Sequence, residues 1–221
     1  MQEVIDFLNA LAANNNRDWF DTQKQRFAEV KDVFAAQHAD IKALLAQHDE
    51  IEKDKVYRIY RDVRFSKDKT PYKRHLAGSF RRAGHYRRGG YYYQVQPGGS
   101  YIAGGFFGPN AQDLLHIRKQ IQQEPEELRS IVSAPDFQQL FGGLQGEQLK
   151  TAPKGFEVSD PAIDLLRYKQ FIVRRPLTDG EVLSETFPQI VDETFKGMRP
   201  FFDYMSEILT TDLNGESLYD E

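Results

Sequence analysis

The sequence feature that constrains the fold most is a pair of segments with aromatic residues on either side of the turn PGGS. The two segments, Tyr91 to Gln96 and Tyr101 to Phe107, are rich in aromatic residues, which favour β-strands. Between them, Pro97 to Ser100 has the residues that tight turns prefer. The sequence therefore predicts an antiparallel hairpin near the middle of the chain.

Helical periodicity precedes this hairpin. Apolar residues recur at helical spacing over residues 4–11 and again over residues 17–45. Asn14 to Asn16 lies between the two stretches, and we expect it to end the first helix and to cap the second. The second stretch corresponds to about eight helical turns. We expect it to break near His38.

Helical periodicity also follows the hairpin. Asn110 is expected to cap a helix that runs towards Gln123, and Pro125 is expected to begin another helix. The chain is predicted to be helical again from Glu181, with a kink at Pro200. This last region contains an apolar stripe that consists of Val191, Phe195, Met198, Phe202, Met205 and Leu209.

Three further segments are predicted to be strands. Two of them are His75 to Phe80 and Tyr168 to Val173. The third is VYRIYRDVRF, in which strand alternation would place Arg61 on the same face as Tyr57, Ile59, Val63 and Phe65. A helix is the alternative for this segment, because it would pair Arg58 with Asp62.

These elements together predict an α+β protein. Its antiparallel sheet would form a hairpin meander that is flanked by N-terminal and C-terminal helices. We expect a single domain over residues 1–221, with a helical part over 1–50. The sheet-forming core is expected over 55–108 and 168–174, and the remaining helical segments over 110–141 and 181–211.

Composition excludes several classes of protein. The chain has no cysteine, so it has neither a disulfide framework nor a thiolate metal site. No apolar run approaches the roughly 20 residues that cross a bilayer, and the N-terminal segment lacks the basic region of a secretory signal. The histidines show no metal-site spacing, and we expect no cofactor. A soluble cytoplasmic protein with no membrane partner is the prediction.

Charge is distributed very unevenly along the chain. The net charge is −4, yet residues 55–88 contain twelve Lys and Arg against two Asp. Within this region, the stretch RDVRFSKDKTPYKRH interleaves cations with aromatic rings and hydroxyl groups. Arginine and lysine in such a density are typical of sites that bind phosphate or carboxylate. The alternative is that these cations form ion pairs with the acidic helices.

The sequence thus predicts a binding site for a small phosphorylated or carboxylated ligand. We expect Arg61 to be mostly buried and to contact a carboxylate, a carbonyl group or the ligand, because an unpaired buried charge is costly. At least two of Arg58, Arg64, Lys67 and Lys73 are expected to reach the same cavity. The full set of candidate ligand-binding residues is Arg58, Arg61, Arg64, Lys67, Lys69, Tyr72 and Lys73, with Arg167 and Lys169 contributed by another strand. Arg167 and Lys169 could equally form ordinary cross-strand ion pairs.

Two other functions remain open on the sequence. The protein could be an enzyme that acts on such a compound, with His75 or Asp62 as the acid or base. It could also bind nucleic acid through the arginines between Arg81 and Arg88, although a run of this kind is more often an exposed loop. The sequence leaves the ligand and the oligomeric state undetermined.

The motifs NNNRDWF, RFSKDKTPYK and GGFFGP resemble those of a widespread bacterial family known as domain of unknown function 2461. The similarity extends over nearly the whole chain, from Val4 to the final helix. The resemblance implies no particular activity, because none is established for the family. The chain departs from the family pattern at Ala103, where a third glycine is expected before GG. If that glycine run lies close to a ligand, the contact would differ slightly here.

Overall fold

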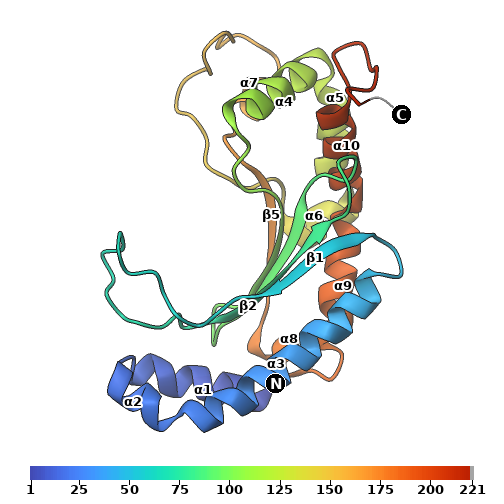
Figure 1. The fold of residues 1–221 in the computed structure, drawn as a ribbon. Helices are drawn as coiled ribbons and strands as arrows, with labels where there is room; N and C mark the ends of the chain where they lie inside the picture. The colour runs from blue at the N-terminus through green and yellow to red at the C-terminus, as the bar shows by residue number, and fades with distance from the viewer. Residues whose placement is uncertain (220–221) are drawn as a thin grey trace. The chain divides into compact units, whose positions relative to one another are not determined.

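The structure, a computed structural model, describes residues 1–219 and contains a five-stranded antiparallel sheet (Figure 1). Its strands pair in the order β1-β2-β3-β4-β5, so each strand lies beside the next one in the chain. The strands are β1 (Ile51–Val56), β2 (Leu76–Arg82), β3 (Gly90–Val95), β4 (Tyr101–Phe106) and β5 (Phe171–Pro176). The α+β prediction is confirmed, and β3 and β4 form the predicted hairpin.

The chain forms two compact units. Unit 1 consists of Met1–Phe80, Tyr92–Ile102 and Pro176–Glu193, and unit 2 of Arg81–Tyr91, Ala103–Arg175 and the chain from Thr194 onward. Strands β2, β3 and β4 each contribute residues to both units.

Unit 1 contains the N-terminal helices, which are α1 (Gln2–Ala13), α2 (Arg17–Thr22) and α3 (Lys24–Leu45). The carbonyl oxygen of the Asn16 side chain accepts a hydrogen bond from the Trp19 amide at 2.9 Å, so this asparagine caps α2 as predicted. The predicted break near His38 is wrong, because the helical stretch is interrupted at Gln23 instead. Residues 24–45 contain neither glycine nor proline, and the buried His38 side chain packs against the sheet.

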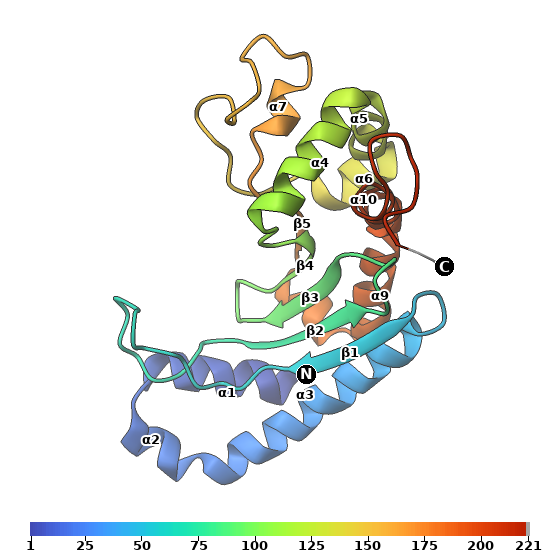
Figure 2. The same ribbon diagram turned by 45° about the horizontal axis from the view of Figure 1, so that its top comes forward.

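Helix α3 packs on one face of the sheet, and the two lie side by side in Figure 2. The His38 ring stacks on Phe80 of β2 at 4.4 Å between ring centres. Its Nδ1 atom is 3.0 Å from the Tyr93 hydroxyl of β3, and its Nε2 atom is 3.3 Å from Asp54 of β1. A side chain at Gly78 would collide with the rings of His38 and Tyr93, so this glycine allows α3 to approach the sheet closely.

Two short stretches complete the helices of unit 1. They are α8 (Asp179–Leu183), which begins with a capping box at Thr178, and the first part of α9 (Phe187–Gly197). The Phe187 ring lies 6.2 Å from the Tyr93 ring, on the same face of the sheet as α3.

Unit 2 contains the remaining helices. They are α4 (Ala111–Gln123), α5 (Pro125–Ser133), α6 (Pro135–Phe141), α7 (Ile163–Leu166) and α10 (Arg199–Thr210), with the end of α9. Asn110 caps α4 and Pro125 begins α5, as predicted. In place of the kink predicted at Pro200, the helix breaks at Met198. This break separates α9 from α10, and Pro200 lies in the first turn of α10. All six residues of the predicted apolar stripe are buried.

The strand predicted over Tyr57 to Phe65 is wrong. The strand ends at Val56, and residues 57–75 form an irregular loop between β1 and β2 with one isolated bridge, Tyr60 to Tyr72. We call this segment the basic loop. Pro71 on the returning arm has no N–H to donate to a ladder, which limits pairing here. Ile59 is buried whereas the Phe65 ring is 96% exposed, so the residues that suggested one apolar face do not share one environment.

Candidate functional site

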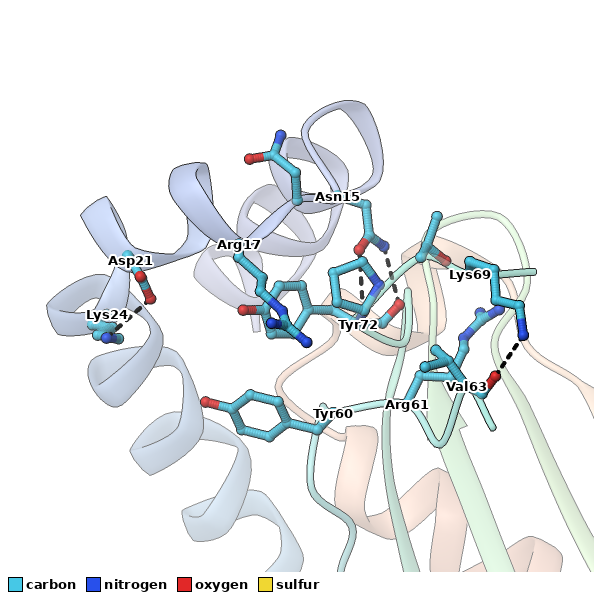
Figure 3. A pocket seen from close by; sticks show the side chains of 12 residues that line it. Asn15, Arg17, Asp21, Lys24, Tyr60, Arg61, Val63, Lys69 and Tyr72 are labelled. Atoms are coloured by element: carbon cyan, nitrogen blue, oxygen red, sulfur yellow. Dashed lines mark hydrogen bonds and ion pairs between the residues drawn. The ribbon is translucent and has the colours of Figure 1, made fainter. Parts of the chain in front are cut away.

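A cavity of about 710 Å³ lies in unit 1 between the basic loop and the start of helices α2 and α3 (Figure 3). We call it the helix-loop cavity. Its lining is rich in polar and aromatic side chains and comprises Asn15, Asn16, Arg17, Asp21, Lys24, Tyr60, Arg61, Val63, Lys69, Thr70, Pro71 and Tyr72.

Asn15 holds the basic loop against the helices. Its side-chain nitrogen donates to the Tyr72 carbonyl at 3.0 Å, and its side-chain oxygen accepts from the Tyr72 amide at 3.2 Å. Figure 3 shows this two-bond contact at the edge of the cavity. The NNN segment therefore has two structural roles. Asn16 caps α2, and Asn15 positions the basic loop, which forms the opposite wall of the cavity.

Two tyrosines form the aromatic part of the lining. The Tyr72 ring is 3% exposed and stacks on Phe20 with 4.0 Å between centres and 17° between planes. Tyr60 is half exposed, and its ring lies 5.4 Å from that of Tyr72. Burial, together with the nearby Tyr60 and Asp21, raises the pKa of Tyr72. The Tyr72 hydroxyl therefore stays protonated at neutral pH and can donate a hydrogen bond.

Four cations line the cavity, from both of its walls. The Arg17 guanidinium extends from α2 towards the two tyrosine rings, and it has no hydrogen-bond or ion-pair partner among residues 1–219 (Figure 3). Lys24 pairs with Asp21 at 2.9 Å. On the loop side, Lys69 donates to the Val63 carbonyl at 2.9 Å, and Arg61 pairs with Asp68. Within the described chain the lining thus holds four cations and one carboxylate.

Asp68 holds the Arg61 side chain in the conformation in which it lines the cavity. Its carboxylate accepts hydrogen bonds from the Thr70 amide at 2.9 Å and the Thr70 hydroxyl at 2.8 Å, and it also pairs with Arg61. These contacts lower the pKa of Asp68 to about 2, and the hydrogen bond from the Thr70 amide has the largest effect. The Arg61 side chain is 26% exposed, so it is only partly buried, and it contacts a carboxylate, which is one of the partners expected for it.

The structure brings together three of the predicted ligand-binding residues: Arg61, Lys69 and Tyr72. The prediction that two more cations reach the same cavity is wrong for the set Arg58, Arg64, Lys67 and Lys73. Without a strand over residues 57–65, side-chain directions in the loop follow local contacts. Arg64 pairs with Asp62 at 2.6 Å, and Lys73 donates to the Arg58 carbonyl at 3.1 Å.

Sequence reasoning missed every lining residue of the helical wall. These residues are Asn15, Asn16, Arg17, Asp21 and Lys24. The motif NNNRDWF contains three of them, but the sequence predicts only helix caps for its asparagines. The available signal was Arg17 itself, a cation placed directly after the cap of a short helix.

Arg167 and Lys169 lie in unit 2, whereas the helix-loop cavity lies in unit 1. They precede β5, which begins only at Phe171. Lys169 forms an ion pair with Glu147 at 2.8 Å. Lys169 therefore has an acidic partner in unit 2, although neither residue of this pair belongs to a strand.

The two candidate acid-base residues do not line the cavity. Burial, followed by the charges of Lys73 and Arg61, lowers the pKa of His75. Asp62 forms an exposed ion pair with Arg64, whose hydrogen bonds lower the pKa of this carboxyl.

The arginines proposed for nucleic-acid contact are partly used inside unit 2. Arg82 is only 3% exposed, and its guanidinium contacts Asp203 at 3.2 Å and the Arg88 carbonyl at 3.1 Å. Arg88 in turn pairs with Asp113 at 3.2 Å. These two side chains stabilise the fold, which leaves fewer cations on this segment for an external phosphate.

Neither a metal site nor a membrane-spanning helix is found among residues 1–219. Among residues 1–219, no cluster of three or more His, Asp or Glu side chains has an arrangement that could hold a metal ion. In the same part of the chain, every helix is too short or too polar to span a bilayer.

Comparison with known proteins identifies the family. The sequence model of a family described as a conserved hypothetical protein, DUF2461, matches residues 3–204. Neither the curated proteins nor the solved structures compared with the chain give a significant match. Because the family model covers most of the sequence, the chain belongs to the conserved hypothetical protein family DUF2461.

Proposed function

We propose that the helix-loop cavity binds a small anionic ligand that carries a phosphate or a carboxylate. The observation that supports this most is the convergence of four cations and one carboxylate on a single cavity, in a chain whose net charge is −4. A positive cavity within an acidic chain attracts anions selectively and increases their local concentration.

The individual contacts suit this role. Arg17 and Arg61 offer planar pairs of donors that match a phosphate or carboxylate, whereas Lys24 and Lys69 provide mobile charges. Asp68 holds Arg61 in place before a ligand arrives, which reduces the entropy that binding would cost. The volume of about 710 Å³ falls within the range of roughly 300–1,000 Å³ that is typical of small-molecule sites.

The two tyrosines extend the proposal to the rest of the ligand. Tyr60 is half exposed beside the buried Tyr72, so a planar or ring-shaped group could pack on its face. The Tyr72 hydroxyl could donate a hydrogen bond to the same ligand. Since His75 and Asp62 lie outside the lining, the proposal assigns binding rather than acid-base catalysis to this cavity.

Isothermal titration calorimetry with inorganic phosphate, pyrophosphate and citrate tests the proposal. We expect at least one of these anions to bind, and the variants Arg17→Met and Arg61→Met each to weaken binding about tenfold or more, as for the loss of a charged hydrogen bond. Arg74→Met is the matched control, because Arg74 is exposed and lies outside the cavity lining. Failure of all three anions to bind the wild type, or an equal loss in the control, would refute the proposal.

A further inference from the structure

A second surface of unit 1 lies on the face of the sheet opposite α3. Strand β1 has the sequence IEKDKV, in which acids and lysines alternate. Asp54 points towards α3, where it contacts His38 and Lys42 at 3.3 and 2.6 Å. Because successive side chains of a strand point to opposite faces, Lys53 and Lys55 lie on the other face. The strand thus separates its charges, with acids towards the helix and lysines away from it.

Three tyrosines lie across this second face. The Tyr92 ring is 6.1 Å from that of Tyr57 and 5.7 Å from that of Tyr101, measured between ring centres. Tyr93 follows Tyr92 in β3 and contacts α3, so strand alternation places Tyr92 on the side away from that helix. All three rings are half-buried, and we call the surface that they form with Lys53 and Lys55 the tyrosine face.

Positive charge gathers on one end of the tyrosine face. The ammonium groups of Lys55 and Lys73 lie 4.8 and 5.5 Å from the centre of the Tyr57 ring. Burial lowers the pKa of Lys73, and the charged groups that lower it further are Arg58, Lys55 and Arg61. These neighbours are all cations, so a bound anion would relieve their mutual repulsion.

We propose that the tyrosine face binds single-stranded nucleic acid. Bases can stack on a row of aromatic rings whatever their sequence, and lysines beside the rings can contact the phosphates that join them. A free phosphate would use the cations but not the rings, and an acidic peptide lacks a planar group for each ring. The surface is separate from the helix-loop cavity, whose lining includes none of Tyr57, Tyr92 and Tyr101.

Fluorescence anisotropy with labelled oligothymidylate and oligouridylate of about ten nucleotides tests this inference. We expect binding that weakens as salt increases. Tyr92→Leu and Tyr101→Leu should each reduce the affinity about tenfold or more, without changing the dependence on salt. The double variant Lys53→Ala/Lys55→Ala should reduce the slope of log affinity against log salt by about 1.4, since each phosphate contact on a single strand contributes about 0.7.

Two controls make the result specific. Lys150→Ala/Lys154→Ala removes the same charge from exposed positions in unit 2 and should leave binding unchanged. Arg17→Met should also bind the oligonucleotides normally, so failure of this inference is distinguishable from failure of the cavity proposal. Retained pyrophosphate binding in the tyrosine variants, or an unchanged circular dichroism spectrum, shows that they fold.

Four outcomes would overturn the inference. They are no binding of either oligonucleotide, an equal loss in the Lys150→Ala/Lys154→Ala control, binding of duplex DNA as tight as that of the single strand, and displacement by poly-glutamate as effective as by unlabelled oligonucleotide. The third would show that exposed bases are not contacted, and the fourth that the surface recognises only negative charge.

Discussion

Replacing Asn15 with alanine should destabilise unit 1 and loosen the helix-loop cavity. The substitution removes both hydrogen bonds between the Asn15 side chain and the Tyr72 backbone, at 3.0 and 3.2 Å. A typical hydrogen bond contributes about 0.5–1.5 kcal/mol net, so the pair contributes about 1–3 kcal/mol. Because the contact is part-buried, water can replace the lost bonds only incompletely, and we expect about 2 kcal/mol.

Urea unfolding followed by tryptophan fluorescence measures this effect. Trp19 is the single tryptophan of the chain, and it lies in α2 beside the cavity, so its signal reports on unit 1. Asn14→Ala is the matched control, because the exposed Asn14 side chain donates only to the Ala10 carbonyl of its own helix. We expect this control to lose less than about 0.5 kcal/mol, as exposed positions usually do. A loss for Asn15→Ala no larger than that of the control would refute the assigned role.

Three further predictions concern unit 1. Gly78→Ala should cost about 1–3 kcal/mol in urea unfolding, because the new methyl carbon would lie 2.5 Å from His38 and from Tyr93; an unchanged midpoint would argue against this packing of α3. Burial lowers the pKa of His38 below its ordinary 6.5, against the opposing effect of its acidic neighbour. The contribution of His38 to stability is therefore complete above pH 6.5 and decreases as the pH falls from there towards the lowered pKa. His38→Gln should show a smaller loss of stability between about pH 7.5 and about pH 5.5 than the wild type, and an equal loss would contradict the assignment. Arg61→Met should change stability by less than about 1 kcal/mol, because its pair with Asp68 is partly exposed; a larger loss would mean that the pair is structural.

Much of the fold could be predicted because its signals are local. The Asn16 cap, the Asn110 cap and the turn at residues 97–100 each depend on residues within a few positions. The apolar stripe of the C-terminal helices likewise follows from spacing alone.

Strand β1 was harder to place. Its alternation is one of charge, in the sequence IEKDKV, and not of hydrophobicity. The neighbouring VYRIYRDVRF has the stronger apolar alternation, so the sequence predicts the strand there instead. The ladder nevertheless stops at Val56, because the returning arm contains Pro71 and the turn that Asp68 and Thr70 stabilise.

The candidate site depends on long-range contacts, which no local pattern specifies. Asn15 and Tyr72 are 57 residues apart, and their contact brings the helical wall to the basic loop. The sequence showed the density of cations in the loop but not which of them share a cavity with Arg17. The charge pattern thus predicted the region of the candidate site, whereas the fold selects the residues that line the cavity.

The most direct test of the central claim, that the helix-loop cavity binds anions, is a crystal structure of the protein soaked with tungstate. Tungstate is a tetrahedral dianion like phosphate, and its anomalous scattering locates it without ambiguity. We predict an anomalous peak inside the cavity in contact with Arg17 or Arg61, and a weaker peak or none in Arg17→Met crystals. Tungstate peaks confined to other surfaces, with none in the cavity, would contradict the account.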